Sequence, residues 1–387
     1  MTTKTTTRAD ASALLALIVG QVCLHACMAG VRVAAPLSAL AQGHSALAVG
    51  VLLALFAAGP IAFALQAGRM ADRHGYHRPL RVAVALCVLG GGVAFASQHY
   101  LALCAAALLS GIGANVGLIA IQRSAGRLAA NATERMRVFS WLGLAPALAN
   151  MLGSVTAGLM IDHAGHRAAF GLLALMPLAA LVAARRVDDD IARPAAGVGE
   201  RPRRAAWALL RLAPLRRLLL VNWLLSASWD LHSFVLPVLG HERGMSASAI
   251  GTILGLFAAS VAAVRLVVPL LAHRLREQQV LAGAMLCVGA VLAAYPLVDD
   301  AAFMAGCAVL LGLALGSVQP MIMSTLHHVT PPERHGEAIA LRSMTINFAS
   351  TAMPLIFGAG GAALGAAALF WVMAAAVAAG SRIARRL

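Results

Sequence analysis

Long apolar segments separated by short polar connections run along almost the whole chain. Each is close to the about 20 residues that a helix needs to cross the hydrocarbon core of a bilayer. They lie near residues 12–37, 45–68, 79–97, 101–126, 136–161 and 168–186, and again near 216–238, 247–272, 278–297, 301–326, 337–360 and 364–383. The pattern predicts an all-α membrane protein with twelve transmembrane helices, because a helix satisfies its own backbone polar groups in lipid.

The second set of apolar segments repeats the first at an offset of 201 residues. Residues 45–58 read SALAVGVLLALFAA, and residues 246–259 read SASAIGTILGLFAA. The same offset pairs Pro36 with Pro237 and Gly111 with Gly312. One six-helix unit repeated in the same orientation predicts two six-helix bundles related by a pseudo-twofold axis along the membrane normal.

The polar stretch between the two sets differs from both. Residues 187–215 contain consecutive aspartates, then proline, glycine and many arginines. We therefore expect an N-terminal six-helix bundle at 1–186, a cytoplasmic linker at 187–215 and a C-terminal six-helix bundle at 216–387. The end of the linker, AAWALLRL, fits a segment that lies along the membrane interface, and a plain tether is the alternative.

Composition and charge agree with a membrane protein and give it an orientation. Of the 387 residues, 60% are hydrophobic and 12% are charged, and the mean hydropathy is +0.82. The net charge of +15 comes from arginines in alternate connections, whereas those near 38–44, 98–100, 297–301 and 361–364 carry none. Arg167 and Arg243 are the exceptions. This is the positive-inside bias and not a nucleic-acid footprint, so both termini are expected in the cytoplasm.

The connection between the second and third segments reads GRMADRHGYHR at residues 68–78. A connection this short joins two antiparallel helices on one side of the bilayer. Gly68 is expected to let a neighbouring helix approach closely, and Gly75 to form a turn that no side chain obstructs. Asp72 lies at a helix end, where it can accept from a neighbouring helix N-terminus or pair with an arginine. A plain charged hairpin is the alternative.

The spacing Gly-x3-Asp-Arg-x-Gly-x2-Arg in this connection resembles the loop between helices 2 and 3 of the major facilitator superfamily. The resemblance implies a transporter of that fold over essentially the whole chain. It also implies that the acid of the loop holds the two halves together on the cytoplasmic side when the transporter faces outward. We therefore assign a role in conformational gating to Gly68, Asp72, Arg73, Gly75 and Arg78.

Two features of proton–drug antiporters in that superfamily are missing. Their helix 4 arginine, three residues before Gln-Gly, has no counterpart in the run from Ala107 to Gly111. Their helix 5 pattern with Gly-Pro near its end is reduced to Gly153-Ser154. These losses weaken the specific case for drug/proton antiport without affecting the predicted fold.

Polar side chains recur on one face of the first helix in each half. In the first half the face carries Gln21, His25, Met28 and Arg32, and the offset of 201 pairs them with Asn222, Ser226, Trp229 and Ser233. Their spacing is helical, so each set shares one face. Matching polar faces are expected to line a shared central cavity that binds substrate. For Arg32, snorkelling to the membrane interface is the alternative.

Asp230 is the acidic residue that lies well inside an apolar segment. Substrate and proton can satisfy one buried acid in turn, which is what a proton-coupled carrier needs. We predict that Asp230 couples transport to protons, with His25 and His232 nearby to relay or sense the proton. The alternatives are a permanent ion pair between Asp230 and Arg32, and a core histidine with satisfied hydrogen bonds at His25.

Three polar side chains in later helices are further candidates for the substrate cavity. Arg342 lies about two turns inside its segment, Asn347 follows five residues later, and Gln319 precedes a helix-breaking proline. Arg32 and Arg342 are the residues that would hold the carboxylate of an organic anion, because arginine pairs with carboxylates in a bidentate manner. The alternative for Arg342 is a topology charge that reaches the surface.

The sequence thus predicts a secondary active transporter of a small organic solute, proton-coupled, directed to efflux by resemblance, and monomeric in a bacterial inner membrane. The alternatives are an organic-anion uptake or exchange carrier and a passive facilitator, each with an arginine-lined site. An enzyme or sensor on the same fold is a further class, but no H-E-x-x-H or nucleophile elbow is present. No cofactor and no metal are expected, because the six cysteines lie in apolar segments without a metal-like cluster.

Overall fold

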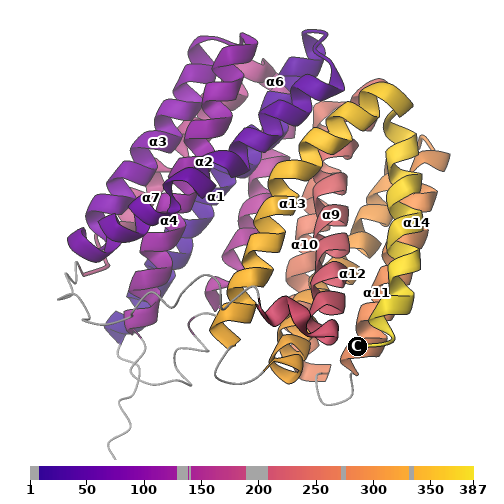
Figure 1. Cartoon of the computed structure of the whole chain (residues 1–387). Helices are drawn as coiled ribbons and strands as arrows, with labels where there is room; N and C mark the ends of the chain where they lie inside the picture. The colour runs from indigo at the N-terminus through magenta and orange to yellow at the C-terminus, as the bar shows by residue number, and fades with distance from the viewer. Residues whose placement is uncertain (1–7, 129–137, 139–140, 189–207, 272–275, 331–334) are drawn as a thin grey trace, which may run out of the picture. The chain divides into compact units, whose positions relative to one another are not determined.

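The computed structural model describes the chain except for residues 1–7, 129–137, 139–140, 189–207, 272–275 and 331–334. The residues it describes form α-helices, short 3-10 helices and turns, with no strand among them. Before residue 189 the helices are α1 (Arg8–Ala41), α2 (Ala46–His74), α3 (His77–Ala96), α4 (Tyr100–Leu128), α6 (Ala145–Leu175) and α7 (Leu178–Ala184) (Figure 1). After residue 207 they are η1 (Leu209–Arg211), α9 (Ala213–Glu242), α10 (Ala247–Leu271), α11 (Glu277–Ala294), η3 (Tyr295–Leu297), α12 (Ala301–Val329), α13 (His335–Leu364) and α14 (Ala366–Ala384).

These helices account for the twelve predicted spans. In the described ranges, nine helices are long and apolar enough to cross a membrane, and one of them, Ala145–Ala184, covers both the fifth and the sixth span. The two remaining spans are α9 and α13, which are long enough but less apolar. Polar side chains such as Asn222, Asp230 and Arg342 interrupt them, so the least apolar helices are those that carry most of the candidate site.

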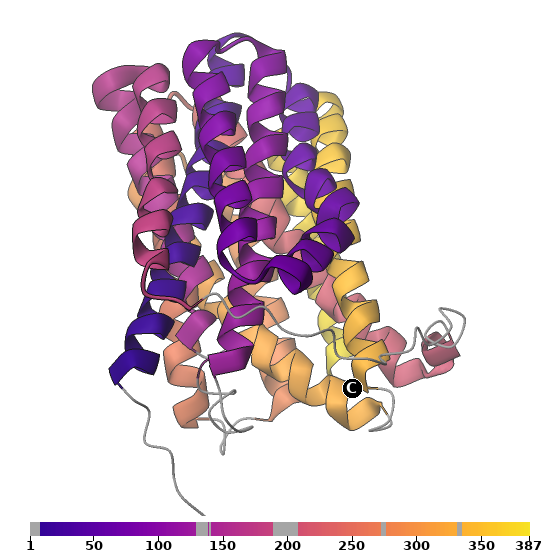
Figure 2. The same cartoon turned by 90° about the vertical axis from the view of Figure 1, so that its left-hand side faces the viewer.

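The helices form two compact units, unit 1 (Met1–Ala39 with Leu55–Ala196) and unit 2 (Leu40–Ala54 with Gly197–Leu387). In unit 1, α3 packs against α4 and α6, and Figure 2 shows these helices running roughly along one direction. In unit 2, α10 packs against α12, α11 packs against α12 and α14, and α9 packs against α13 and α14.

The first part of α2 belongs to unit 2. A Cβ atom on Gly50 would lie 2.4 Å from the carbonyl oxygen of Pro354 in α13, so the two backbones touch where this glycine has no side chain. A boundary at residue 186 would assign the first part of α2 to the N-terminal bundle, whereas the contacts assign it to unit 2. The division into bundles at 1–186 and 216–387 with a linker at 187–215 stays a prediction.

The repeat seen in the sequence returns in the helix ends. α1 and α9 end 201 residues apart, α2 and α10 begin 201 residues apart, and α4 and α12 match at both ends. In the turns between the first two helices of each half, Gly43 and Gly244 have φ angles of 80° and 67°, a left-handed conformation that favours glycine. Ser45 and Ser246 then accept hydrogen bonds from the amides three residues later, at 3.3 Å and 3.2 Å, as N-cap residues do.

A close helix contact also repeats. A Cβ atom on Gly111 of α4 would lie 2.5 Å from the carbonyl oxygen of Phe56 in α2, and one on Gly312 of α12 would lie 2.4 Å from that of Phe257 in α10. Both pairs of residues are separated by the same offset of 201. The two halves therefore use the same missing side chain to bring equivalent helices into backbone contact.

The fifth and sixth spans differ in detail from the prediction. A turn at residues 143–144 precedes α6, which begins at Ala145 with Pro146 in its first turn. Residues 138, 141 and 142, before the turn, are also helical, so the turn interrupts the fifth predicted span, and its start near residue 136 stays a prediction. The expected break between residues 161 and 168 is a kink within α6, where Gly165 has φ 81° and ψ 167°.

Candidate functional site

Between residues 221 and 240, one face of α9 keeps part of its surface accessible while the other faces are buried. Between residues 221 and 240 the half-buried side chains are Trp223, Ser226, Trp229 and Ser233. Their spacing of three to four residues puts them on one face. Three members of the predicted polar stripe therefore lie on the accessible side of α9, and the fourth, Asn222, is buried beside them.

α1 has the same pattern 201 residues earlier. His25, Met28 and Arg32 are half-buried, and Gln21 is buried. Each of these residues is buried or half-buried to the same degree as its counterpart in α9. The first helices of the two halves thus carry half-buried side chains at equivalent positions of the repeat.

Two polar groups of α1 lie within one turn. Nδ1 of His25 is 3.2 Å from the carbonyl oxygen of Gln21, a distance that fits a hydrogen bond donated by the ring. The other ring nitrogen, Nε2, is then the acceptor of a neutral imidazole. Oε1 of Gln21 is buried and has no hydrogen-bond partner among the residues that are described. A buried oxygen in this state is available to a polar ligand or water.

Arg342 joins three helices of unit 2. From α13 its Nε donates to Oδ1 of Asn222 in α9 at 3.3 Å, and its Nη2 donates to Oε1 of Gln319 in α12. The residue is only 9% exposed. Over the described ranges no carboxylate pairs with it, and Nη1 has no hydrogen-bond acceptor. A buried charge normally has an acidic partner or faces water, so the guanidinium retains donors for an anion.

Asp230 of α9 also contacts α13, at a different depth from the contact between Arg342 and Asn222. It is 4% exposed, and its Oδ2 accepts from Oγ of Ser350 in α13 at 3.4 Å. Asn222 and Asp230 are eight residues apart, as are Arg342 and Ser350. Polar contacts therefore connect α9 and α13 at two levels, about 12 Å apart along the helices. Ser350 was not predicted, because a hydroxyl within a run of small residues carries no sequence signal.

His232 packs into the core of unit 2. It is fully buried, and its ring lies 4.6 Å from that of Phe257 and 5.6 Å from that of Tyr295, measured between centroids. Neither ring nitrogen has a hydrogen-bond partner in the described part of the chain. The structure therefore does not connect His232 to Asp230, and its part in proton coupling stays a prediction.

Asn347 does not join the group around Arg342. Its side chain is exposed, and its carbonyl oxygen accepts from Oγ1 of Thr351 at 3.0 Å. Of the three later cavity candidates, the structure brings together Arg342 and Gln319 and leaves Asn347 on another face of α13.

The predicted gating connection is only partly described. Gly75 has a φ angle of 68°, which confirms the expected glycine turn, and Arg73 and Arg78 are exposed. The side chain of Asp72 lies outside the described residues. The expected close approach of a helix at Gly68 is wrong, because a Cβ atom there would meet no described atom within 4 Å.

Two residues that follow the glycine turn were missed by the sequence analysis. Tyr76 is buried and contacts the ring of His77 edge-on at 5.4 Å between centroids. Burial raises the pKa of the Tyr76 phenol above its ordinary value, so the phenol stays protonated. Nε2 of His77 donates to the carbonyl oxygen of Val187 at 2.9 Å. This hydrogen bond connects the start of α3 to Val187, the first residue of the expected linker.

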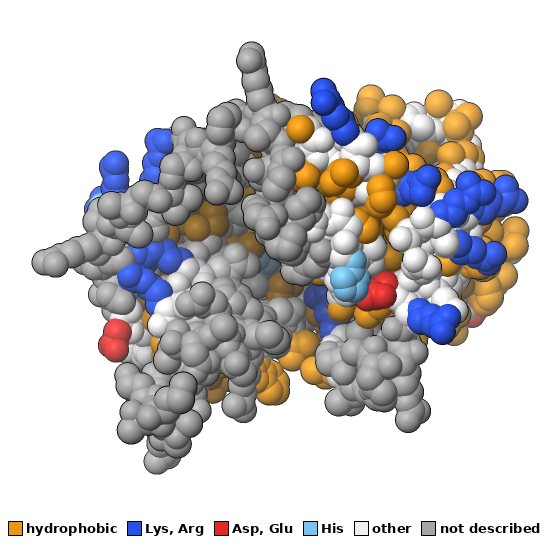
Figure 3. All heavy atoms as spheres, turned by 60° about the horizontal axis from the view of Figure 1, so that its bottom comes forward, with side chains coloured by type: hydrophobic (Ala, Val, Ile, Leu, Met, Phe, Trp, Pro, Cys, Tyr) orange, Lys and Arg blue, Asp and Glu red, His pale blue; other side chains and the backbone are white. Residues whose placement is uncertain are grey.

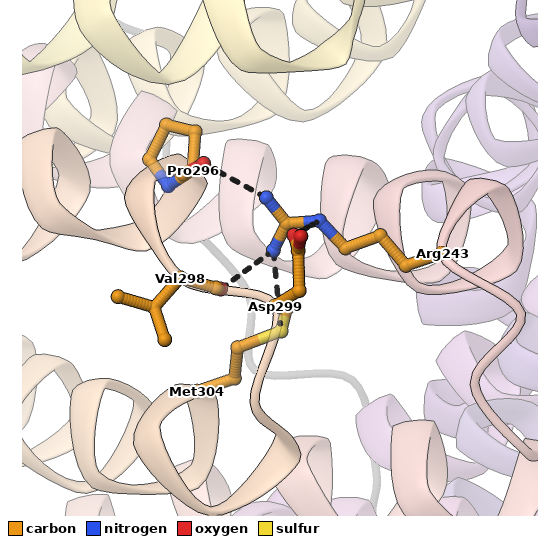
Figure 4. Close-up of polar contacts among 5 residues, drawn as sticks. All are labelled: Arg243, Pro296, Val298, Asp299 and Met304. Carbon is orange, nitrogen blue, oxygen red and sulfur yellow. Dashed lines mark hydrogen bonds and ion pairs between the residues drawn. The ribbon is translucent and has the colours of Figure 1, made fainter.

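The two arginines that break the charge pattern have local partners. Arg243, just after α9, pairs through Nε with Asp299 at 2.7 Å and donates to the carbonyl oxygens of Pro296 and Val298, each at 2.9 Å (Figure 4). Its Nη1 also lies 3.6 Å from the sulfur of Met304. The guanidinium of Arg167 lies 4.9 Å from the ring centroid of Phe95. Both exceptions therefore make structural contacts.

Comparison with solved structures places the chain among membrane transporters by fold. A POT family transporter in complex with a thioalcohol-conjugated peptide matches with a TM-score of 0.76 at 14% identity, over 96% of this chain and 94% of that one. A mutant of the nucleoside transporter NupG matches with 0.78 at 12% identity, over 97% and 99%. A bacterial homolog of the human lysosomal transporter Spinster, inward-facing and unoccupied, matches with 0.74 at 11% identity, over 98% and 94%.

Sequence comparison gives the family. No curated protein matches the chain significantly. The sequence model of the Major Facilitator Superfamily matches residues 17–302 and, in a second match, 218–385. No group of three or more His, Cys, Asp or Glu that could hold a metal ion occurs in the residues described. The chain belongs to the Major Facilitator Superfamily and is a multi-pass membrane protein that acts as a secondary transporter.

Proposed function

We propose that the chain moves a small organic solute out of the cell in exchange for protons, with Asp230 as the coupling acid. The observation that carries the proposal is the position of this carboxyl group, which is 4% exposed within the 30-residue helix α9. A charge at such a depth is costly, and intramembrane acids commonly mark proton or substrate paths. The neighbouring accessible line of Ser226, Trp229 and Ser233 supplies a wall for the solute.

In this proposal the solute and the proton satisfy Asp230 in turn. When the carboxyl group is charged, it needs a cationic or hydrogen-bonding partner, and when it is protonated that need disappears. His25, with Nε2 as its free acceptor, is the candidate relay in the other half. Efflux as the direction rests on the family resemblance of residues 68–78.

The moving parts are the bundles at 1–186 and 216–387, joined by the linker at 187–215. Rocking of such repeats around a site near the bilayer midplane provides alternating access. Asp72, Arg73, Gly75 and Arg78 would hold the cytoplasmic side closed in one state. The arginine distribution supports cytoplasmic termini in a bacterial inner membrane, and a monomer suffices because both repeats are in one chain.

The second candidate is an organic-anion exchanger or facilitator, and Arg342 favours it. The guanidinium is buried and bonded to two neutral amide oxygens, from Asn222 and Gln319. A carboxylate on the solute would supply the missing negative charge and use the remaining donors in a bidentate pair. In this case Asp230 would be a structural acid held by Ser350.

Proton release on solute binding distinguishes the two candidates. Purified protein in weakly buffered detergent solution is mixed with a panel of organic cations, neutral solutes and carboxylates, and the pH is followed. Wild type is compared with Asp230→Asn and with Asp188→Asn, an exposed acid that serves as the matched control. Release that disappears only in Asp230→Asn supports proton coupling. Binding without proton movement in any variant rejects coupling and favours the arginine-held anion.

A further inference from the structure

A groove of about 520 Å³ lies between the start of α9 and the end of α14, both in unit 2. Four arginines line it: Arg216 and Arg217 from the first turns of α9, and Arg382 and Arg386 from the end of α14 and just beyond. Figure 3 looks at the end of the molecule that carries it, and arginine side chains gather there next to hydrophobic ones. None of the described residues that line the groove is acidic.

Among the residues that the structure describes, the four guanidinium groups have no negative partner. Arg216 donates to the carbonyl oxygen of Leu210 at 3.2 Å, and Arg217 donates to that of Arg386 at 3.3 Å. Over the described ranges none of the four forms an ion pair. Like charges gathered around one hollow repel each other unless an anion lies between them. Most of the donors of these planar, forked groups are unused, and phosphate is an anion that they fit.

The rest of the wall is apolar and lies deeper in the helices. Leu220 is about one turn further into α9 than the arginine pair, and Ala379 is one turn further into α14 than Arg382 and Ile383. α14 is one of the helices long and apolar enough to cross a membrane. The groove therefore changes from basic at the end of the span to apolar inside it, which is the polarity profile of a phospholipid.

We propose that this groove binds an anionic phospholipid, with the arginines on the headgroup phosphate and Leu220, Ala379 and Ile383 against the first part of an acyl chain. By the arginine distribution the groove opens on the cytoplasmic leaflet, where anionic lipids attract basic segments. A bound lipid would connect α14 to the helix that carries Asp230. The inference does not depend on which solute the chain transports.

Native mass spectrometry of the purified full chain tests the lipid site. Phosphatidylglycerol and phosphatidylcholine with identical acyl chains are titrated separately, and bound lipids are counted. The groove variant carries Arg→Gln at residues 216, 217, 382 and 386. The control variant carries Arg→Gln at residues 185, 186, 211 and 385, four exposed arginines outside the groove that remove the same charge.

Wild type is expected to prefer phosphatidylglycerol by about tenfold or more, and the groove variant to lose that preference while the control variant keeps it. Equal loss in both variants would show unspecific attraction to a basic surface and overturn the proposal. Equal affinity of wild type for the two lipids would do the same. Size-exclusion profiles and thermal unfolding check that the variants are folded.

A second variant leaves the charge unchanged and separates a lipid from a soluble phosphate. Ala379→Trp fills the apolar part of the groove and keeps all four arginines. It should weaken binding of phosphatidylglycerol by about tenfold, because the acyl chain loses its wall. Glycerol 1-phosphate, added as a competitor, should displace the lipid only weakly. Displacement at equal concentration, with Ala379→Trp binding the lipid normally, would identify a phosphate-ester site and overturn the lipid assignment.

Discussion

Two arginines of unit 2 have mostly covered side chains but different surroundings. The side chain of Arg243 is 13% exposed, and each of its three nitrogens has a partner, including the carboxylate of Asp299. Arg342 is 9% exposed and has the amide oxygens of Asn222 and Gln319. Burial alone therefore does not separate the two. The partners separate them, because every nitrogen of Arg243 has an acceptor and one acceptor is charged, whereas Arg342 has two neutral oxygens.

The comparison teaches how to tell a structural arginine from a ligand-binding one. Arg243 connects the end of α9 to the chain around η3 and the start of α12, and each of its three nitrogens already has an acceptor there. Arg342 connects three helices through neutral oxygens, so its positive charge and Nη1 remain available. A buried guanidinium whose charge is uncompensated is costly, and an anionic solute or water must supply the compensation. Changing either set of partners tests this difference.

Arg342→Ala should have the largest effect. Loss of the guanidinium should weaken binding of carboxylated solutes by about 2 kcal/mol or more, about 30-fold in affinity, if the arginine holds the carboxylate. Quenching of tryptophan fluorescence measures this, because Trp223 and Trp229 lie on the accessible line of α9. Arg276→Ala, at an exposed position before α11, is the control. Unchanged carboxylate binding in Arg342→Ala would make this arginine structural.

Gln319→Glu should make the interior arginine resemble Arg243. The new carboxylate would lie where the amide oxygen accepts from Nη2 of Arg342 and would compensate its charge. Binding of carboxylates should fall by about tenfold or more, since the solute then meets an acid. Thermal stability should not fall. Gln319→Met removes the acceptor without adding charge and should bind carboxylates within a few-fold of wild type, so equal losses in both variants would contradict the electrostatic explanation.

The contacts of Arg342 show which features of the site can be predicted from the sequence. Arg342, Gln319 and Asn222 were each predicted as polar residues inside apolar segments. Their contact was not predicted, because it depends on the rotation of α9, α12 and α13 about their axes, which one sequence does not encode locally. The same limit hid Ser350 as the partner of Asp230 and the rings of Phe257 and Tyr295 around His232.

The fold was more predictable because its signals are local. Apolar runs give the spans, Ser45 and Ser246 cap helices by hydrogen bonds to nearby amides, and Gly43 and Gly244 mark turns through their own φ angles. The repeat adds a check, since each element is seen twice. Prediction failed where a long-range contact decides, as at Gly68, and it missed the turn at residues 143–144 inside the fifth predicted span.

Arg243→Ala should mainly reduce stability. The variant removes two hydrogen bonds from a charged donor to carbonyl oxygens and an ion pair, and we expect a loss of about 2 kcal/mol in the free energy of unfolding. Thermal unfolding in detergent measures it, with Arg185→Ala as an exposed control. Carboxylate binding below the unfolding temperature should match wild type.

Arg342→Met provides the matching stability test for the interior. Replacement of a buried charge by an apolar side chain of similar length is often neutral or stabilising. The variant should therefore unfold no earlier than wild type while losing carboxylate binding. An unfolding temperature as low as that of Arg243→Ala would mean that both arginines are structural, and the comparison would fail.

Asp299→Asn should have the smallest effect, although it removes the one carboxylate of the Arg243 group. Asp299 is 82% exposed, and water and salt screen an ion pair of this kind. The asparagine oxygen can still accept from Nε, and the carbonyl oxygens of Pro296 and Val298 still hold the guanidinium in place. We expect a loss of under about 1 kcal/mol, declining further at high salt. A loss as large as that of Arg243→Ala would show that the acid, and not the set of carbonyl oxygens, makes this arginine structural.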